Sequence, residues 1–353
     1  MSIVTYREAI AESMRYAMQR HDHTIMFGLG ITDHIGTFGT TKGLEEEFGS
    51  DRVFETPIAE DSMTGFALGA SLSGLYPIHI HIRTDFMLLA MNQLVNSIAK
   101  YRYMYGGLFR APMLIRSVVG RSWGQGAQHS QSLQALFAHS PGLCVVMPAS
   151  AHTAQETYRY AVDRCTMPVI SLEHRLLYDY SFKADAVSGE IGNPLTSFRV
   201  REGNDVTIVA TSVMVQEAIR SADFIREREN ITADIIDLHC ITHPDENLIL
   251  ESVGKTGRLI VVDTGWESFG VCAEVARIVA VHDPRLLKEP IVCLPVAKSA
   301  CPTAKTLENW FYPDMGNIID AVYALCFGAM EHGRELPSDD YVAQVHKHFK
   351  GPF

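Results

Sequence analysis

Short apolar runs alternate with segments in which apolar residues recur at helical spacing along most of the chain. This alternation is typical of a mostly parallel β-sheet covered by helices, with right-handed crossover connections. The longest expected helix covers residues 86–105, and its apolar stripe indicates core packing rather than a cofactor site. In the first half of the chain the expected strands are residues 23–27, 52–55, 77–82, 113–118, 143–147 and 169–173.

A break in this pattern divides the chain into two domains. Residues 186–204 are mostly small, polar, glycine or proline, which predicts a linker. We therefore expect an α/β protein with domains at residues 1–185 and 205–330, each a mostly parallel sheet flanked by helices. Residues 331–353 form a polar tail, which either docks on a partner or is a loosely ordered end. The strands expected in the second domain are residues 205–212, 233–241, 257–264 and 291–295.

Composition narrows the function classes. The 353 residues carry a formal net charge of −11 with no run of Lys or Arg, which argues against nucleic acid as a partner. No segment has the ~18 uninterrupted apolar residues that span a bilayer, so no membrane association is expected. The seven cysteines include no Cys-x-x-Cys pair, so we expect a reducing, cytoplasmic location. His79 and His81 share a strand face without a third ligand in view, so we expect no metal site.

The stretch DRVFETPIAEDSMTGFALG, residues 51–69, contains the first candidate for chemistry. A short strand ends at Thr56-Pro57, and Glu60 follows among apolar neighbours before a helix rich in small residues. Desolvation at a strand end disfavours the charged carboxylate, so the pKa of Glu60 should rise towards the range useful for proton transfer. The alternative is a carboxylate that complements the dipole at a helix N-terminus.

A second candidate lies in VVGRSWGQGAQHSQS, residues 118–132. Glycines loosen the chain after a buried strand, and His129 reaches the sheet edge where open α/β folds bind their ligands. His129 can act as acid, base or charge stabiliser near neutral pH. The alternative is a solvent-facing histidine beside Ser130 as a helix cap. The chain contains no nucleophile elbow, P-loop or dinucleotide-binding glycine motif.

Six segments, in order along about the first 325 residues, carry a resemblance to a known family. They are GTFGTTKGLEEEFGSDRVFETPIAE (36–60), FMLLAMNQLVNSIAKYRYMYGG (86–107), GAQHSQS (126–132), HSPGLCVVMP (139–148), EHRLLYD (173–179) and GRLIVVDTGWESFGVCAEV (257–275). The chain resembles the beta subunit of the thiamine-diphosphate-dependent 2-oxo acid dehydrogenases, of the pyruvate or branched-chain type. Equivalently, it resembles the pyrimidine-binding and C-terminal domains of transketolase.

The resemblance implies a role for each candidate residue. In this family the glutamate of the TPIAE segment, here Glu60, hydrogen-bonds the aminopyrimidine of thiamine diphosphate and promotes loss of the thiazolium proton. Phe86 corresponds to the aromatic residue that stacks on the pyrimidine, and Ile58 to a neighbouring pyrimidine contact. His129 corresponds to the active-site histidine that meets substrate or intermediate. The implied catalytic residues are thus Glu60 and His129.

The resemblance also implies partners. In the family, the diphosphate and Mg²⁺ are held by a Gly-Asp-Gly…Asn motif on a separate alpha subunit, and this chain lacks that motif. We therefore expect thiamine diphosphate shared with an alpha subunit that also holds Mg²⁺, in an α₂β₂ assembly acting on a small 2-oxo acid. In the standard case a lipoyl acyltransferase component docks on the C-terminal domain and receives the acyl group.

Several positions depart from the family pattern near the expected site. Leu29 stands where the family usually has an acidic residue, Asn92 replaces the aspartate of an Asp-Gln pair, and Cys165 replaces a potassium-site aspartate. Arg83 and Thr84 replace commoner apolar or aromatic residues. These changes indicate an atypical substrate and no bound K⁺.

Our primary interpretation is the beta subunit of a 2-oxo acid dehydrogenase-like decarboxylase. The alternative is a subunit of a split transketolase-like or acyloin-forming thiamine-diphosphate synthase without a lipoyl partner, which the departures at Leu29, Asn92 and Cys165 leave open. A non-catalytic structural partner is a third reading, and the presence of Glu60, Phe86 and His129 together counts against it.

Overall fold

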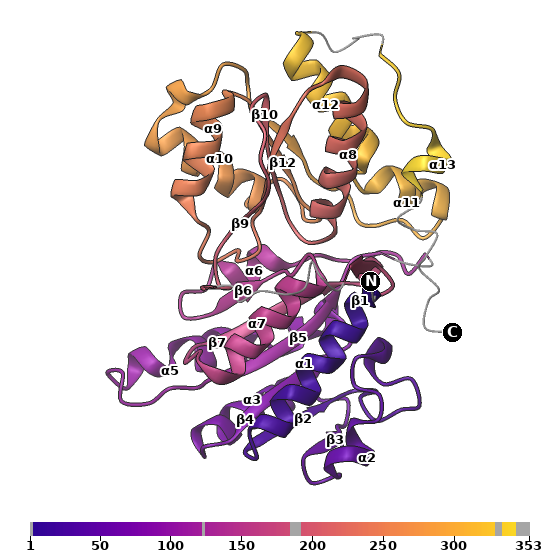
Figure 1. Ribbon diagram of the computed structural model, residues 1–353. Coiled ribbons are helices and arrows are strands. Elements are labelled where there is room, and N and C mark those ends of the chain that lie inside the picture. Colours follow the sequence, from indigo (N-terminus) through magenta and orange to yellow (C-terminus); the bar gives the residue numbers. More distant parts are fainter. Residues whose placement is uncertain (1–2, 122–123, 184–191, 329–333, 344–353) are drawn as a thin grey trace. The chain divides into compact units, whose positions relative to one another are not determined.

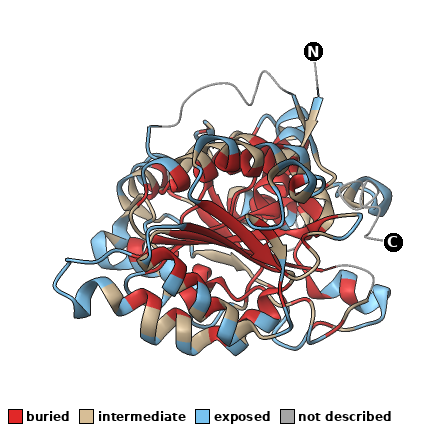
Figure 2. Cartoon of the chain, turned by 90° about the horizontal axis from the view of Figure 1, so that it is seen from below, coloured by how far each residue is buried: buried red, intermediate tan, exposed pale blue. Residues whose placement is uncertain are grey.

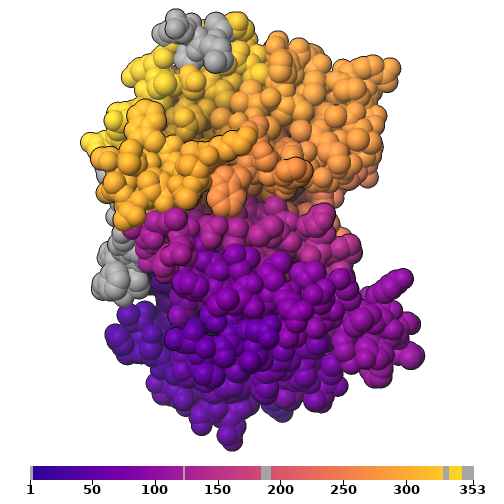
Figure 3. Space-filling model, turned by 180° about the vertical axis from the view of Figure 1, so that it is seen from behind, coloured from indigo at the N-terminus to yellow at the C-terminus, as the bar shows by residue number. Residues whose placement is uncertain are grey.

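The computed structural model describes residues 3–121, 124–183, 192–328 and 334–343 (Figure 1). Its residues form two compact units. Of the described residues, unit 1 comprises 3–121, 128–183 and 192–195, and unit 2 comprises 124–127, 196–328 and 334–343. Each is a contiguous body in the space-filling view, unit 1 mainly indigo to magenta and unit 2 mainly orange to yellow (Figure 3).

Unit 1 is built on six parallel strands in the order β3-β2-β4-β5-β7-β6. All six expected strands of the first half are confirmed, each within one residue of the expected ends. A separate antiparallel pair joins β1 (Ile3–Thr5) to β8 (Ser181–Lys183). The six strands are β2 (Thr24–Gly28), β3 (Val53–Glu55), β4 (Tyr76–His81), β5 (Met113–Val119), β6 (Cys144–Val146) and β7 (Pro168–His174).

Helices cover this sheet and bury its strands (Figure 2). Helix α1 (Tyr6–Arg20) begins with a capping box formed by Thr5 and Glu8, and it lies beside α7 (Ala151–Asp163) (Figure 1). His139 follows the last residue of its helix. Unit 1 also contains the helices α2 (Leu44–Phe48), α3 (Glu60–Leu72) and α6 (Gln134–Ala138) and the 3-10 helices Thr37–Gly39 and Arg175–Leu177.

The expected long helix at residues 86–105 is not uniform. Its hydrogen-bond pattern changes from α to 3-10 to π and back to α, so its side chains do not keep a single spacing. The apolar stripe could not reveal this, because periodicity measures only the average turn. The four segments are α4 (Thr84–Met87), a 3-10 turn (Leu88–Ala90), a π-helix (Asn92–Ile98) and α5 (Ala99–Met104).

Unit 2 is a mixed five-stranded sheet in the order β13-β12-β10-β11-β9. Its edge strand β9 (Phe198–Arg201) is antiparallel to β11 and lies within residues 186–204, where a linker is expected; residues 186–191 lie outside the described residues. The alternation Phe-Arg-Val-Arg was too short and too polar to predict an edge strand. The other strands are β10 (Val206–Ala210), β11 (Ala233–Asp237), β12 (Leu259–Val262) and β13 (Val292–Leu294).

Helices lie on both faces of this second sheet. α8 (Val213–Glu229) packs with α12 (Met315–Phe327) on one face, and α9 (Glu246–Thr256) with α10 (Val271–His282) on the other (Figure 1). Within the described part of the chain, no helix is long and apolar enough to cross a bilayer. Shorter helices are a 3-10 turn (Pro284–Leu286), α11 (Lys305–Phe311) and α13 (Asp339–Val342).

A buried ion pair lies in the centre of unit 1. Arg116 on β5 and Glu173 on β7 are each 1% exposed and make two hydrogen bonds, of 2.6 and 2.9 Å. The Tyr178 hydroxyl donates a hydrogen bond to Glu173 at 2.7 Å, and Arg116 donates a hydrogen bond to the Thr40 hydroxyl at 3.0 Å. Burial alone would lower the pKa of Arg116, but Glu173 raises it above its ordinary value. The charges therefore satisfy each other within the core.

Part of the polar tail packs on its own chain. Arg220 of α8 donates hydrogen bonds to the carbonyl oxygens of Tyr341 and Val342, and its guanidinium lies 5.4 Å from the Tyr341 ring centroid. Residues 344–353 lie outside the described residues. Tyr341 and Val342 of the tail are therefore held by α8.

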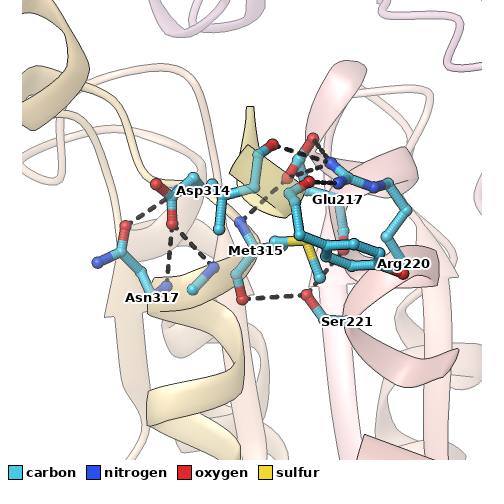
Figure 4. Close-up of polar contacts among 9 residues, drawn as sticks. Glu217, Arg220, Ser221, Asp314, Met315 and Asn317 are labelled. Atoms are coloured by element: carbon cyan, nitrogen blue, oxygen red, sulfur yellow. Dashed lines mark hydrogen bonds and ion pairs between the residues drawn. The ribbon is translucent and has the colours of Figure 1, made fainter. Parts of the chain in front are cut away.

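The same arginine faces a buried carboxylate. Glu217, one turn earlier on α8, pairs with Arg220 at 3.1 Å and accepts the backbone N–H of Met315 at 3.0 Å (Figure 4). Burial raises the pKa of Glu217 to about 7, against the lowering influence of Arg220. This cluster joins α8 to the start of α12 and to α13.

We expect Glu173→Gln to destabilise unit 1 by about 3–5 kcal/mol, because the Arg116 charge would stay buried without its counter-ion. Amide hydrogen exchange along β5 and β7 measures this free energy of opening. Glu47→Gln is the control, since Glu47 pairs with Arg15 at the surface, where such a pair contributes about 0–1 kcal/mol. Equal effects of the two substitutions would contradict this interpretation.

We expect Arg220→Met to release residues 339–343 from α8. Hydrogen bonds from a charged donor contribute about 1.5–3 kcal/mol, so amide exchange in α13 should accelerate about tenfold or more. Arg226→Met, at an exposed position of the same helix, should leave that exchange unchanged. Slow exchange in Arg220→Met would show that Tyr341 packs without help from the guanidinium.

Candidate functional site

All four residues predicted for the site follow the carboxyl ends of parallel strands in unit 1. Ile58 and Glu60 follow β3, Phe86 follows β4, and His129 follows β5. The sheet order reverses between β2 and β4, and open α/β sheets bind ligands at such a switch point. The strand ends bring residues that are distant in sequence to one edge.

Glu60 is the first residue of α3 and is partly buried within this chain. This position matches the alternative of a carboxylate at a helix N-terminus, and it leaves the side chain accessible to a ligand. Ile58 is 82% exposed, an unusual degree for a large apolar residue beside a carboxylate. Asp61 accepts a hydrogen bond from Gln93 at 3.3 Å, which ties the start of α3 to the helical segment after Phe86.

His129 and Phe86 are in direct contact. Their ring centroids are 5.2 Å apart at an interplanar angle of 83°, an edge-to-face arrangement. Phe86 is 40% exposed, so part of its ring is available for stacking. The alternative of Ser130 as a helix cap is wrong, because α6 begins at Gln134 with Leu133 at the cap position. The structure thus brings two of the four predicted residues together.

Charged side chains next to this ring pair were not recognised as site residues. Arg83, which is 5% exposed, donates from Nη1 to the backbone oxygen of His129 at 2.8 Å. Asp85, which is 9% exposed, accepts a hydrogen bond from the Gln131 side chain at 2.8 Å. Burial lowers the pKa of Arg83 to about 10 and raises the pKa of Asp85. The sequence signal that could have identified them as site residues is their position directly after β4, at the carboxyl edge of the sheet.

A second buried guanidinium follows β7. Arg175 is 1% exposed, and its Cζ lies 4.7 Å from the centroid of the Phe38 ring. Burial, and then repulsion by Arg83, lower the pKa of Arg175 to about 9. Two guanidinium groups therefore influence each other at this edge of the sheet, and both stay charged at neutral pH.

Two further features shape the edge. Glu55, at the end of β3, accepts the backbone N–H groups of Gly30 and Ile31 at 2.5 and 3.1 Å, and so fixes the loop after β2. Gly120 has φ +88°, and a Cβ there would lie 2.1 Å from Nε2 of His174. The chain can leave β5 beside β7 only because residue 120 has no side chain.

Two histidines lie beneath α3. The Thr64 hydroxyl, one turn after Glu60, is 3.3 Å from Nε2 of His79 and 3.4 Å from Nε2 of His81. Burial lowers the pKa of His79 to about 4 and that of His81 well below its ordinary value. As expected, the two rings share one face of β4, with centroids 4.2 Å apart.

Comparisons with known proteins agree with this architecture. Residues 2–180 match the family model "Transketolase, pyrimidine binding domain", and residues 197–318 match "Transketolase, C-terminal domain". The chain is 37% identical over 325 residues to the pyruvate dehydrogenase E1 component subunit beta of Rickettsia conorii, covering 92% of this chain and 98% of that protein. The chain belongs to this family of 2-oxo acid dehydrogenase beta subunits. The resemblance inferred from the sequence is thereby confirmed.

Other relatives extend the match. The mitochondrial E1 beta subunit of Saccharomyces cerevisiae is 36% identical over 322 residues, covering 90% of this beta-subunit chain and 88% of the yeast protein. Among solved structures, one titled "Split gene transketolase, inactive beta4 tetramer" aligns with a TM-score of 0.73 at 22% identity. That alignment covers 92% of this chain and 98% of the other, and it shows a shared fold.

We expect unit 1 of this beta subunit to lose stability as the pH falls from about 6.5 towards 4. In that range the unfolded chain binds a proton at His79 that the folded chain excludes. This difference in proton binding lowers the free energy of unfolding by about 3 kcal/mol at pH 4. Hydrogen exchange in β4 across this range measures the effect. His79→Leu should reduce the slope, whereas the exposed control His34→Leu should not. An unchanged slope in His79→Leu would contradict the assignment.

Proposed function

We propose that the chain is the beta subunit of a thiamine-diphosphate-dependent decarboxylase that acts on a 2-oxo acid. The observation that carries the proposal is the contact between Phe86 and His129, whose strand-end loops belong to the same sheet edge as the loop of Glu60. The names of the E1 beta relatives support the same reaction class.

The exposed groups suit an aminopyrimidine ring. Ile58 and Phe86 present apolar surface that this chain leaves uncovered, and the partly buried carboxylate of Glu60 follows Ile58 by two residues. A flat heteroaromatic ring requires such apolar contacts together with a hydrogen-bonding partner at its edge. The chain has no Gly-Asp-Gly…Asn motif for a diphosphate and Mg²⁺, so we assign both to an alpha subunit in an α₂β₂ assembly.

Each residue would then have one task. Thiamine diphosphate, when bound, supplies the carbon nucleophile and the electron sink for loss of CO₂. Glu60 would exchange a proton with a nitrogen of the pyrimidine, and Phe86 and Ile58 would hold the ring in place. His129 would hold or donate a proton at the substrate oxygen, and its contact with the Phe86 ring would help to orient its imidazole for that purpose.

A second candidate is a split transketolase-like or acyloin-forming synthase without a lipoyl partner. The buried Arg83 beside His129, where the family has apolar or aromatic residues, is the observation that favours it. Transfer of the acyl group to a lipoyl domain, measured on the complex, separates the two candidates.

We expect Glu60→Gln to lower the rate of CO₂ release by the co-expressed complex by about 10²–10⁴, because an amide cannot exchange the proton. Binding of thiamine diphosphate, measured by calorimetry, should weaken far less. Glu46→Gln on the exposed face of α2 is the matched control and should retain full activity. Full activity of the Glu60→Gln complex would refute the role of this carboxylate.

A further inference from the structure

We propose that Arg83 binds a second anionic group of the substrate, a carboxylate or phosphate that remains on the substrate after CO₂ has left. The inference rests on the proposed function and specifies its substrate class. It starts from one buried guanidinium that lies beside the predicted catalytic histidine.

Arg83 is buried with most of its donors unused. Its side chain and backbone are together only 5% exposed, yet among the described residues it makes a single hydrogen bond, from Nη1 to the His129 oxygen at 2.8 Å. A guanidinium has five N–H donors, and a buried one is normally paired with anions or several acceptors. That one bond holds the guanidinium beside the backbone of His129. Arg83 also precedes Phe86 by only three residues along the chain.

The surrounding charge favours an anion. Arg175 is near enough for the two guanidinium groups to repel each other, which lowers the pKa of Arg175. The carboxylate of Asp85 acts on both guanidinium groups, but it forms no ion pair with Arg83 within the described residues. Its Oδ1 instead accepts a hydrogen bond from the Gln131 side chain at 2.8 Å. An anion at Arg83 would relieve the repulsion and accept charge-assisted hydrogen bonds, and a planar carboxylate or phosphate matches the guanidinium fork.

The bound anion is not the carboxylate that is lost. A cation paired with that carboxylate would stabilise the substrate more than the transition state, because the negative charge leaves the group as CO₂ forms. An anion elsewhere on the substrate keeps its charge throughout, so its binding energy positions the keto carbon. The favoured substrates are therefore 2-oxo acids with a distal carboxylate or phosphate.

The test compares three 2-oxo acids with the co-expressed complex: 2-oxobutanoate, which has no second anion, 2-oxoglutarate and 3-phosphohydroxypyruvate. The readout is the ratio of kcat/KM for each anionic substrate to that for 2-oxobutanoate, measured as CO₂ release. For the anionic substrate that the wild-type complex prefers, Arg83→Met should lower this ratio roughly 100-fold, mainly by raising KM. Arg83→Lys should lower the ratio less, because lysine keeps the positive charge. Arg226→Met, the same change at an exposed site in unit 2, should leave the ratio at the wild-type value.

Calorimetric titration with glutarate and with inorganic phosphate gives a second readout that needs no turnover. The wild-type complex and Arg226→Met should bind one of these anions, and Arg83→Met should bind neither. The proposal would be overturned if the wild-type ratio were about 1 for both anionic substrates. It would also be overturned if the Arg83→Met complex matched the wild type in both the ratio and the titration. Failure of the proposed function gives a different result: no CO₂ from any substrate, with anion binding at Arg83 still detected.

Discussion

Between β5 and β7 the first sheet must bury a guanidinium and a carboxylate, and the site depends on how that pair is held. Arg116 and Glu173 satisfy each other across adjacent strands, and Tyr158 on α7 adds a hydrogen bond to the carboxylate. Separation of the pair would leave a charge in the core, so the register of β5 against β7 is strongly fixed. The loops that lead to His129 and Arg175 begin at the ends of these two strands.

The constraint extends to the sheet edge through stacked rings. Tyr178 donates to Glu173 and stacks on Phe38 at 5.4 Å between centroids, and Phe38 in turn lies against the Arg175 guanidinium. A core ion pair and an edge arginine are thus connected by packed groups. Preorganised charge of this kind is what a site for an anionic substrate requires, because little reorganisation remains to be done on binding.

The sequence predicted the fold well where periodicity and strand ends carry the information. All six strands of unit 1 were expected within one residue, since buried parallel strands are apolar runs bounded by turn residues. Strand β9 was missed because an edge strand with alternating arginines resembles a linker, and the π-helix at residues 92–98 was missed because periodicity averages over turns. The contact between Arg220 and α13 was not predicted, because a tertiary contact leaves no local signal in the sequence.

The sequence predicted the site residues that lie in motifs, but it did not predict those whose role depends on tertiary packing. Glu60, Phe86, His129 and Ile58 came from motifs, and only the Phe86–His129 contact could be checked as geometry within this chain. Arg83 was noticed as a departure from the family, but its burial and its bond to the His129 backbone depend on three-dimensional packing. Asp85 and Arg175 become visible as one charged group only when β4 and β7 are placed in the same sheet.

The central claim is that this chain supplies half of a shared cofactor site. The most direct test is calorimetric titration of thiamine diphosphate with Mg²⁺ into the isolated chain and into its complex with the proposed alpha subunit, obtained by co-expression. We predict binding to the complex and none to the isolated chain. Tight binding to the isolated chain, or no binding to either, would contradict the account.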